Sequence, residues 1–192
     1  MQPMTTRKPK GYAGINHTTR GGDILAVLQT IHLPEQTLGP DLAARLKKVQ
    51  LTLWYPISDF LEMLERLDQK LGSYHLRQVG WNIFNRYHAE GVRTHVKSAR
   101  QLLDGFNAMY HEGNKGTQIG GWKVLSFGPG RAEVEKATPH HCQMEEGIVA
   151  EALRAVGVPA QVSQSKCFRK GDDVCVFVIE TTCTDARWFG QE

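Results

Sequence analysis

Four cysteines in the second half of the chain are the residues with the clearest chemical potential. Cys167, Cys175 and Cys183 follow one another at intervals of eight residues, and Cys142 precedes them directly after two histidines at 140–141. Thiolate sulfur and imidazole nitrogen are ligands that zinc takes in tetrahedral sites. An eight-residue interval is not a zinc signature in itself, and free cysteine is also a common small core residue. Spacing alone therefore does not decide whether these cysteines are metal ligands, core residues or a redox pair.

The segments around the cysteines predict how these residues could meet. Residues 160–170 and 173–182 read as two strands joined by a turn at Gly171-Asp172, so Cys167 and Cys175 should lie near each other across a hairpin. Residues 142–157 predict a helix that begins at Cys142, where the helix N-terminus lowers the pKa of a thiol. The second strand is apolar on both faces, which predicts a central strand of a sheet.

The first half of the chain is predicted to be helical. Residues 57–71 carry apolar side chains at spacings of three and four, with Pro56 before them and Gly72 after them. Similar patterns over 76–87 and 99–110 predict two further helices. Strands at 122–127 and 131–137 follow, around a turn at 128–130. The sequence therefore predicts an α+β fold in which a helical layer packs on an antiparallel sheet.

Length and composition favour one globular domain. The chain has 192 residues, of which 41% are hydrophobic and 22% charged, and its net charge of +3 does not favour nucleic-acid binding. We expect a flexible tail over 1–22, one domain over 23–180 with its helical part at 23–112 and its sheet part at 120–180, and a C-terminal tail over 181–192. No apolar run predicts a membrane span or a signal peptide, so a cytoplasmic protein with reduced cysteines is expected.

A resemblance covers about residues 120–180. The stretch "PHHCQMEEGIVAEALRAVGVPAQVSQSKCFRKGDDVCVFVI" resembles the 4-vinyl-reductase-like domain, a small-molecule-binding domain. That domain shares its fold with bacterial haem–nitric-oxide-binding domains and with subunits of the TRAPP tethering complex. In the first half, "WYPISDFLEMLERLDQKLG" is similar to myxobacterial proteins of unknown function, which implies no activity.

The resemblance implies a zinc site. In zinc-binding members of the family, three cysteines and one glutamate hold the metal, and Cys142, Cys167 and Cys175 match the cysteine positions. The glutamate position is Gln164 in this chain, and a neutral amide is a poor zinc ligand. We therefore expect His141 to serve as the fourth ligand, with the adjacent His140 as the alternative.

The resemblance also implies a ligand cavity between the helical layer and the sheet. Its expected lining is Trp81, Phe84, Tyr87, Phe106, Met109, Tyr110 and Trp122. Aromatic residues at helical spacing are equally typical of a packed core. Haem–nitric-oxide-binding domains hold the haem propionates with a Tyr-x-Ser-x-Arg triplet, and this sequence has none, which argues against haem.

No sequence motif predicts catalysis. The sequence lacks His-Glu-x-x-His, Gly-x-Ser-x-Gly and Gly-x-Gly-x-x-Gly, so we do not expect an enzyme. The sequence is interpreted as a sensory or regulatory domain that binds an apolar small molecule, forms a homodimer and signals through a partner protein. The alternative is a protein-interaction scaffold of the TRAPP type with a filled core and no ligand.

Overall fold

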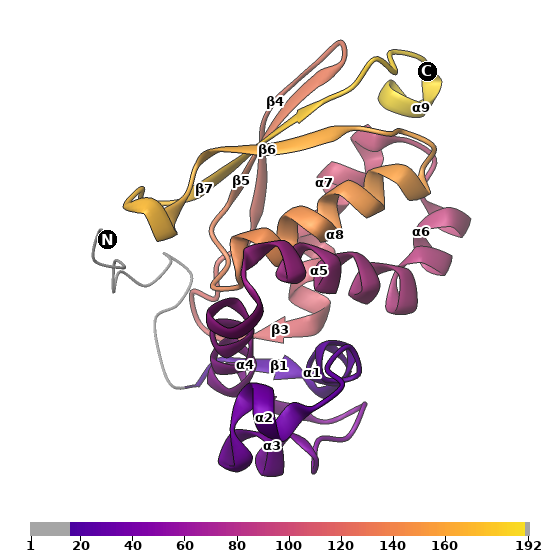
Figure 1. Ribbon diagram of the computed structural model, residues 1–192. Coiled ribbons are helices and arrows are strands. Elements are labelled where there is room, and N and C mark those ends of the chain that lie inside the picture. Colours follow the sequence, from indigo (N-terminus) through magenta and orange to yellow (C-terminus); the bar gives the residue numbers. More distant parts are fainter. Residues whose placement is uncertain (1–15, 191–192) are drawn as a thin grey trace.

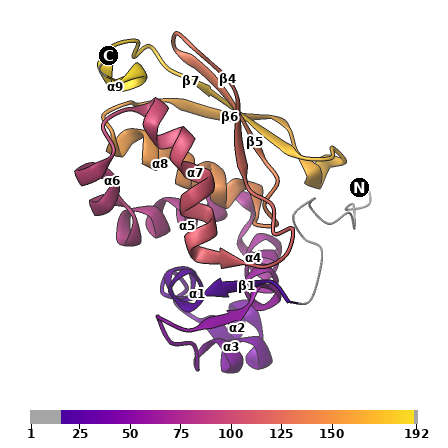
Figure 2. The same ribbon diagram turned by 180° about the vertical axis from the view of Figure 1, so that it is seen from behind.

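The computed structural model describes residues 16–190. The chain has two parts, and a pair of packed helices lies where they meet (Figures 1 and 2). The first part consists of β1 (Thr18–Arg20), α1 (Gly21–Leu28), α2 (Pro34–Leu38), α3 (Pro40–Leu46), β2 (Trp54–Pro56) and α4 (Ile57–Leu71). The second part contains α5 (Ser73–Tyr87), α6 (Ala89–His95), α7 (Ala99–Gly113), β3 (Asn114–Lys115), β4 (Trp122–Gly128), β5 (Arg131–Lys136), α8 (Cys142–Ala155), β6 (Gln161–Lys166), a 3₁₀ turn (Phe168–Lys170), β7 (Cys175–Glu180) and α9 (Ala186–Phe189).

The α+β prediction is confirmed. Four antiparallel strands form a sheet in the order β4-β5-β7-β6, and α7 and α8 lie along one face of it (Figure 1). The strand β7 lies between two neighbours and is buried along its first five residues, as its continuous apolar sequence predicts. The helix α4 buries the apolar residues of one face and ends at Gly72, whose φ of 82° suits glycine.

A second, smaller sheet was not predicted. It joins β2, β1 and β3 in that order, with antiparallel pairing on both sides of β1. The expected N-terminal tail of residues 1–22 therefore contains β1 and the start of α1, while residues 1–15 lie outside the described residues. The expected C-terminal tail contains α9, because Trp188 is fully buried and stacks on Phe127 at a ring-centroid distance of 4.6 Å.

Two glycines bring α5 and α8 into close contact. A Cβ atom on Gly80 would lie 1.8 Å from the carbonyl oxygen of Met144, and one on Gly147 would lie 2.0 Å from the carbonyl oxygen of Arg77. Side chains larger than hydrogen would force the two backbones apart at both positions. The pair α5–α8 is therefore packed backbone against backbone.

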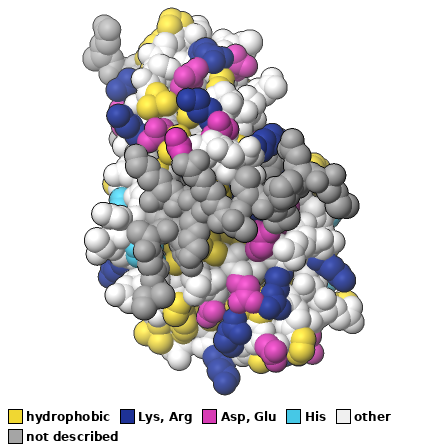
Figure 3. Space-filling view, turned by 90° about the vertical axis from the view of Figure 1, so that its left-hand side faces the viewer, with side chains coloured by type: hydrophobic (Ala, Val, Ile, Leu, Met, Phe, Trp, Pro, Cys, Tyr) yellow, Lys and Arg dark blue, Asp and Glu magenta, His cyan; other side chains and the backbone are white. Residues whose placement is uncertain are grey.

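Two main hydrophobic clusters meet at this helix pair. One packs α1–α4 against α5, with Leu76, Val79 and Ile83 from α5 and Met144 from α8. The other packs α5–α9 against the large sheet and includes Phe84 and Val149. No helix within residues 16–190 is long and apolar enough to cross a membrane. On the face shown in Figure 3, the described positive and negative side chains are interspersed.

Candidate functional site

Three of the four cysteines converge at one end of the large sheet. Cys142 begins α8, Cys167 follows β6 and Cys175 begins β7, so the helix start meets the turn end of the β6–β7 hairpin. The Sγ atom of Cys142 lies 3.2 Å from that of Cys175 and 3.5 Å from that of Cys167. All three side chains are buried, and their sulfur atoms lie within 4.8 Å of one another. Cys183 lies apart, with its thiol 3.3 Å from a carboxylate oxygen of Asp185.

A buried ion pair adjoins the sulfur atoms. The fully buried Lys136 places its Nζ atom 2.7 Å from a carboxylate oxygen of Glu145 and 3.9 Å from the sulfur of Cys142. The hydroxyl of Thr138 donates to both oxygens of Glu145. Every charged group in this interior thus has a partner, as burial of charge requires.

The contacts among the three sulfur atoms displace the pKa values of the thiols in opposite directions. Hydrogen bonds from Cys142 and Cys175 lower the pKa of Cys167, and backbone N–H groups that follow it in the 3₁₀ turn lower it further. The hydrogen bond with Cys142 raises the pKa of Cys175, and the one with Cys167 raises the pKa of Cys142. The cluster therefore favours one thiolate, at Cys167.

His141, expected as the fourth metal ligand, is directed at α4. Its Nδ1 accepts the backbone N–H of Gln143 at 3.3 Å, and its Nε2 lies 3.3 Å from a carboxylate oxygen of Asp68. Burial lowers the pKa of His141 to about 4, so it is a neutral imidazole. The amide of Gln164 donates to Glu146 at 3.0 Å. Among His, Cys, Asp and Glu side chains of residues 16–190, the donor group around the sulfurs consists of the three cysteines.

Ion pairs tie the cysteine-bearing hairpin to α4. The guanidinium of Arg169, in the turn after Cys167, lies 2.9 Å from Glu65 and 3.2 Å from Asp68. Asp68 also faces His141, which precedes Cys142. Both segments that carry the cysteines thus contact the same turn of one helix in the first part of the chain.

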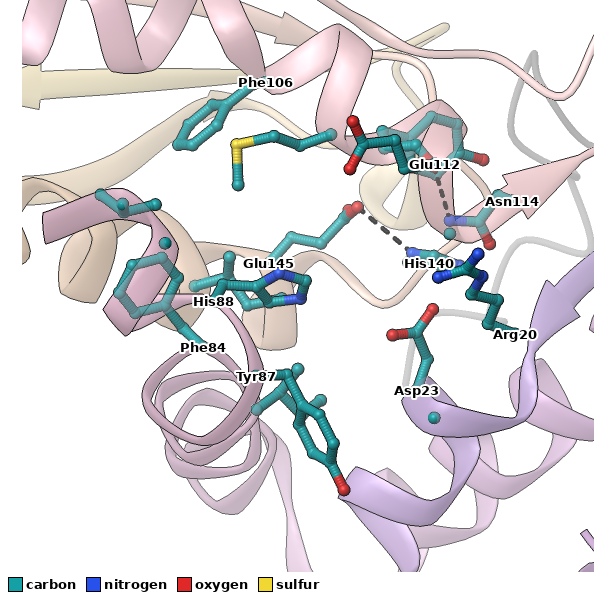
Figure 4. A pocket seen from close by; sticks show the side chains of 18 of the residues that line it. Arg20, Asp23, Phe84, Tyr87, His88, Phe106, Glu112, Asn114, His140 and Glu145 are labelled. Atoms are coloured by element: carbon teal, nitrogen blue, oxygen red, sulfur yellow. Dashed lines mark hydrogen bonds and ion pairs between the residues drawn. The ribbon is translucent and has the colours of Figure 1, made fainter. Parts of the chain in front are cut away.

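A cavity of about 780 Å³ lies next to this cluster, between the two parts of the chain (Figure 4). Its walls come from β1, α1, α5, α6, α7 and α8 and the segments that join them. Of the seven residues expected to line a ligand cavity, six do so: Phe84, Tyr87, Phe106, Met109, Tyr110 and Trp122. The side chain of Trp81 is 43% exposed and does not line this cavity.

One end of the cavity is polar, a feature that sequence reasoning missed. Figure 4 shows Arg20, Asp23, Glu112, Asn114 and His140 grouped at this end, and Phe84 and Phe106 at the other. These polar residues come from β1, α1, the α7–β3 junction and the β5–α8 loop. No motif joins such distant segments, so only their shared position in the fold reveals the group.

One ring nitrogen of His140 lies near a carboxylate, and the other has no hydrogen-bond partner among the described residues. Its ring packs edge-on against Phe60 and Tyr110, and its Nδ1 lies 3.5 Å from a carboxylate oxygen of Glu145. Its Nε2 has no hydrogen-bond partner among the described residues. Burial lowers the pKa of His140 to about 3, and the charge of Lys136 adds to this effect, so the imidazole is neutral.

Asp23 lies at the same end. Its carboxylate accepts a hydrogen bond from the hydroxyl of Thr19 at 3.3 Å. Burial raises the pKa of Asp23 to about 6, an effect that the hydroxyl and the neighbouring Arg20 only partly oppose. The hydroxyl hydrogen of Tyr110 is not available to a ligand, because it is donated to the backbone carbonyl of Ile119 at 2.8 Å.

Comparison with known proteins shows the fold. No protein-family model and no curated protein matches the chain. Among solved structures, an H-NOX protein from K. algicida superposes with a TM-score of 0.62 at 14% identity, covering 84% of this chain and 96% of its own. An H-NOX protein from S. oneidensis gives a TM-score of 0.59 at 18% identity, covering 88% of this chain and 99% of its own. The expected fold, which H-NOX domains share, is thereby shown over most of the chain.

Proposed function

We propose that this chain is a sensory domain that binds a small, largely apolar molecule in its internal cavity and signals to a partner protein. The cavity carries the proposal: its volume of about 780 Å³ lies within the usual range of ligand pockets. Such pockets combine apolar walls with a few polar groups that fix orientation, and this cavity has that composition. The homodimer and the cytoplasmic location remain predictions from the sequence.

The cavity lies where a ligand can influence the whole domain. Its walls include Ile83 and Met144 from the first hydrophobic cluster and Phe84 and Val149 from the second. A molecule that contacts both clusters stabilises the arrangement of the two parts that best encloses it. Differential affinity for two arrangements is the physical requirement for transmission of a binding event.

The polar end of the cavity does not match the propionates of haem, although the imidazoles of His88 and His95 also line the cavity. The structural neighbours include H-NOX proteins in Fe(II) and Fe(II)NO states and structures that probe heme distortion in that family. Haem carries two propionates, which require cationic groups or N–H donors. The polar end has Arg20 but also Asp23, Glu112 and the acceptor atoms of Asn114 and His140. We therefore propose a ligand other than haem.

We also propose that the three convergent cysteines hold one zinc ion, with the fourth position open to water or another exchangeable ligand. Three sulfur donors within 4.8 Å of one another support this proposal, because zinc thiolate bonds of about 2.3 Å place sulfurs at such separations. A bound zinc would join α8 to the β6–β7 hairpin and so brace this end of the sheet.

Ligand extraction from natively purified protein tests the proposed function. Gly91 is an exposed residue at the rim of the cavity, and a Cβ atom there would meet no other atom within 4 Å, so Gly91→Phe adds bulk at the cavity entrance without a backbone clash. Gly105→Phe is the matched control, since Gly105 is also helical with open space but does not line the cavity. We expect one molecular species, identified by mass spectrometry, with wild type and the control, and its loss with Gly91→Phe. An empty cavity in all three proteins would favour the scaffold alternative.

A further inference from the structure

The polar end of the cavity presents hydrogen-bond acceptors that lack donors. Because a buried acceptor without a donor is unfavourable, a ligand that supplies the donors gains affinity there. We propose that the ligand carries a basic nitrogen with N–H groups, as in an aromatic or aliphatic amine, at one end of an apolar body. This inference rests on the proposed function of the cavity and specifies its ligand class.

Asn114 provides the first acceptor. Its side chain is only 4% exposed, and its Nδ2 donates to the backbone carbonyl of Tyr110 at 3.0 Å. That hydrogen bond fixes the amide orientation, because a carbonyl accepts only from the NH₂ group. The Oδ1 atom then has no hydrogen-bond partner among the described residues, and Asn114 lines the cavity. An amide oxygen in this position accepts from an N–H or O–H of a ligand.

His140 provides the second acceptor. The ring nitrogen that faces the carboxylate of Glu145 is the one that carries the proton, because a carboxylate accepts hydrogen bonds. The other nitrogen, Nε2, therefore has a free lone pair, and the side chain is only 8% exposed. Lys136 and Thr138 also contact the carboxylate of Glu145 and hold it in place, which keeps this orientation of the imidazole.

Charge at the polar end favours a cationic head group. Asp23 and Glu112 each contribute a carboxylate, whereas Arg20 contributes one guanidinium. The guanidinium of Arg20 already lies over the ring of Trp54, at 5.5 Å from its centroid. The polar end thus contains two acceptors without donors and two carboxylates, but only one cationic side chain, which already contacts an aromatic ring. An ammonium group satisfies the acceptors and the charge together, whereas a carboxylate can use only Arg20.

Three probes with the same naphthalene body test the head group. They are 1-naphthylmethylamine, 1-naphthalenemethanol and 1-naphthoic acid, titrated into the full chain by isothermal calorimetry at neutral pH. We expect the amine to bind at least about tenfold more tightly than the acid, with the alcohol between them, because hydrogen bonds to charged groups are the strongest. Equal or tighter binding of the acid would overturn the inference.

Two variants locate the head group. His140→Phe keeps the ring packing against Phe60 and Tyr110 but removes the acceptor nitrogen, and Asp23→Asn removes the charge at constant shape. Each should weaken the amine about tenfold. His140→Phe should leave the affinity of the acid unchanged, and Asp23→Asn should leave it unchanged or raise it, because a repelling carboxylate is lost. His32→Phe, at an exposed histidine outside the cavity, should change neither affinity. If His140→Phe does not fold, Asp23→Asn decides alone. An unchanged amine affinity in the folded variants refutes the inference.

The possible outcomes distinguish failure of the proposed ligand class from failure of the proposed function of the cavity. If none of the probes binds, or if Gly91→Phe binds all of them as well as wild type, the cavity is not the ligand site and both proposals fail. If hemin binds stoichiometrically and displaces the amine, the cavity remains a ligand site but its head-group class is wrong. Amine-selective binding that Gly91→Phe abolishes supports both.

Discussion

Removal of Lys136 should destabilise the fold strongly. Its Nζ lies 2.7 Å from Glu145 and 2.5 Å from the backbone carbonyl of His140, with both ion-pair side chains almost fully buried. Lys136→Met retains most of the side-chain volume but leaves the carboxylate without a counter-ion. Loss of one partner of such a pair costs about 3–5 kcal/mol. The hydrogen bonds from Thr138 to Glu145 remain, so we expect the lower end, about 3 kcal/mol.

Urea unfolding measures this effect, and the double variant distinguishes its cause. Lys136→Met combined with Glu145→Met should lose less stability than the sum of the single variants, because the second change removes the stranded charge. Lys47→Met is the matched control at the exposed pair with Glu35, and it should not change stability measurably. A loss below about 1 kcal/mol for Lys136→Met, or additive losses in the double variant, would refute the reasoning.

Three further predictions concern packing, pH and metal. Gly80→Ala should lower the free energy of unfolding by about 1–3 kcal/mol, because its Cβ would lie 1.8 Å from a carbonyl oxygen. Gly105→Ala should not lower it, because a Cβ there meets no other atom. Equal melting temperatures of the two variants would contradict this prediction. Because folding raises the pKa of Asp23 from 3.8 to about 6, its carboxylate costs stability as the pH rises through that window. Asp23→Asn should therefore gain up to about 3 kcal/mol over wild type at neutral pH but little near pH 4, and an equal gain at both pH values in urea unfolding would speak against it. Elemental analysis should find about one zinc per chain in wild type and Cys183→Ser and none in Cys167→Ser; equal zinc in all three would exclude the cluster.

Local sequence patterns predicted the elements that have a strong periodicity. The helix α4 runs over Ile57–Leu71 and α8 over Cys142–Ala155, close to the expected ranges. The strand β7 is central, as expected from apolar residues on both of its faces. The convergence of Cys142 with Cys167 and Cys175 followed from the same reasoning, because a hairpin and a helix start fix positions within a few residues.

The features that the sequence did not reveal depend on contacts between distant segments. The small sheet pairs residues 18–20 with 54–56 and 114–115, and these segments of two or three residues are too short to show a strand pattern. The position of Asn114 at the cavity follows from that pairing. The orientation of His141 is set by Asp68, more than seventy residues earlier, so its spacing from Cys142 could not predict its partner.

The close backbone contacts of α5 with α8 at Gly80 and at Gly147 determine which walls of the cavity can move. Backbones that touch have no side-chain layer that could repack, so α5 and α8 can only shift together, as one rigid body. Ligand entry and exit must then be accommodated on the opposite side, by α1 and the segment around Leu51, or by α6. Hydrogen exchange should accordingly be slow along α5 and α8 in the free and the bound protein, and ligand should slow it in α1 and α6.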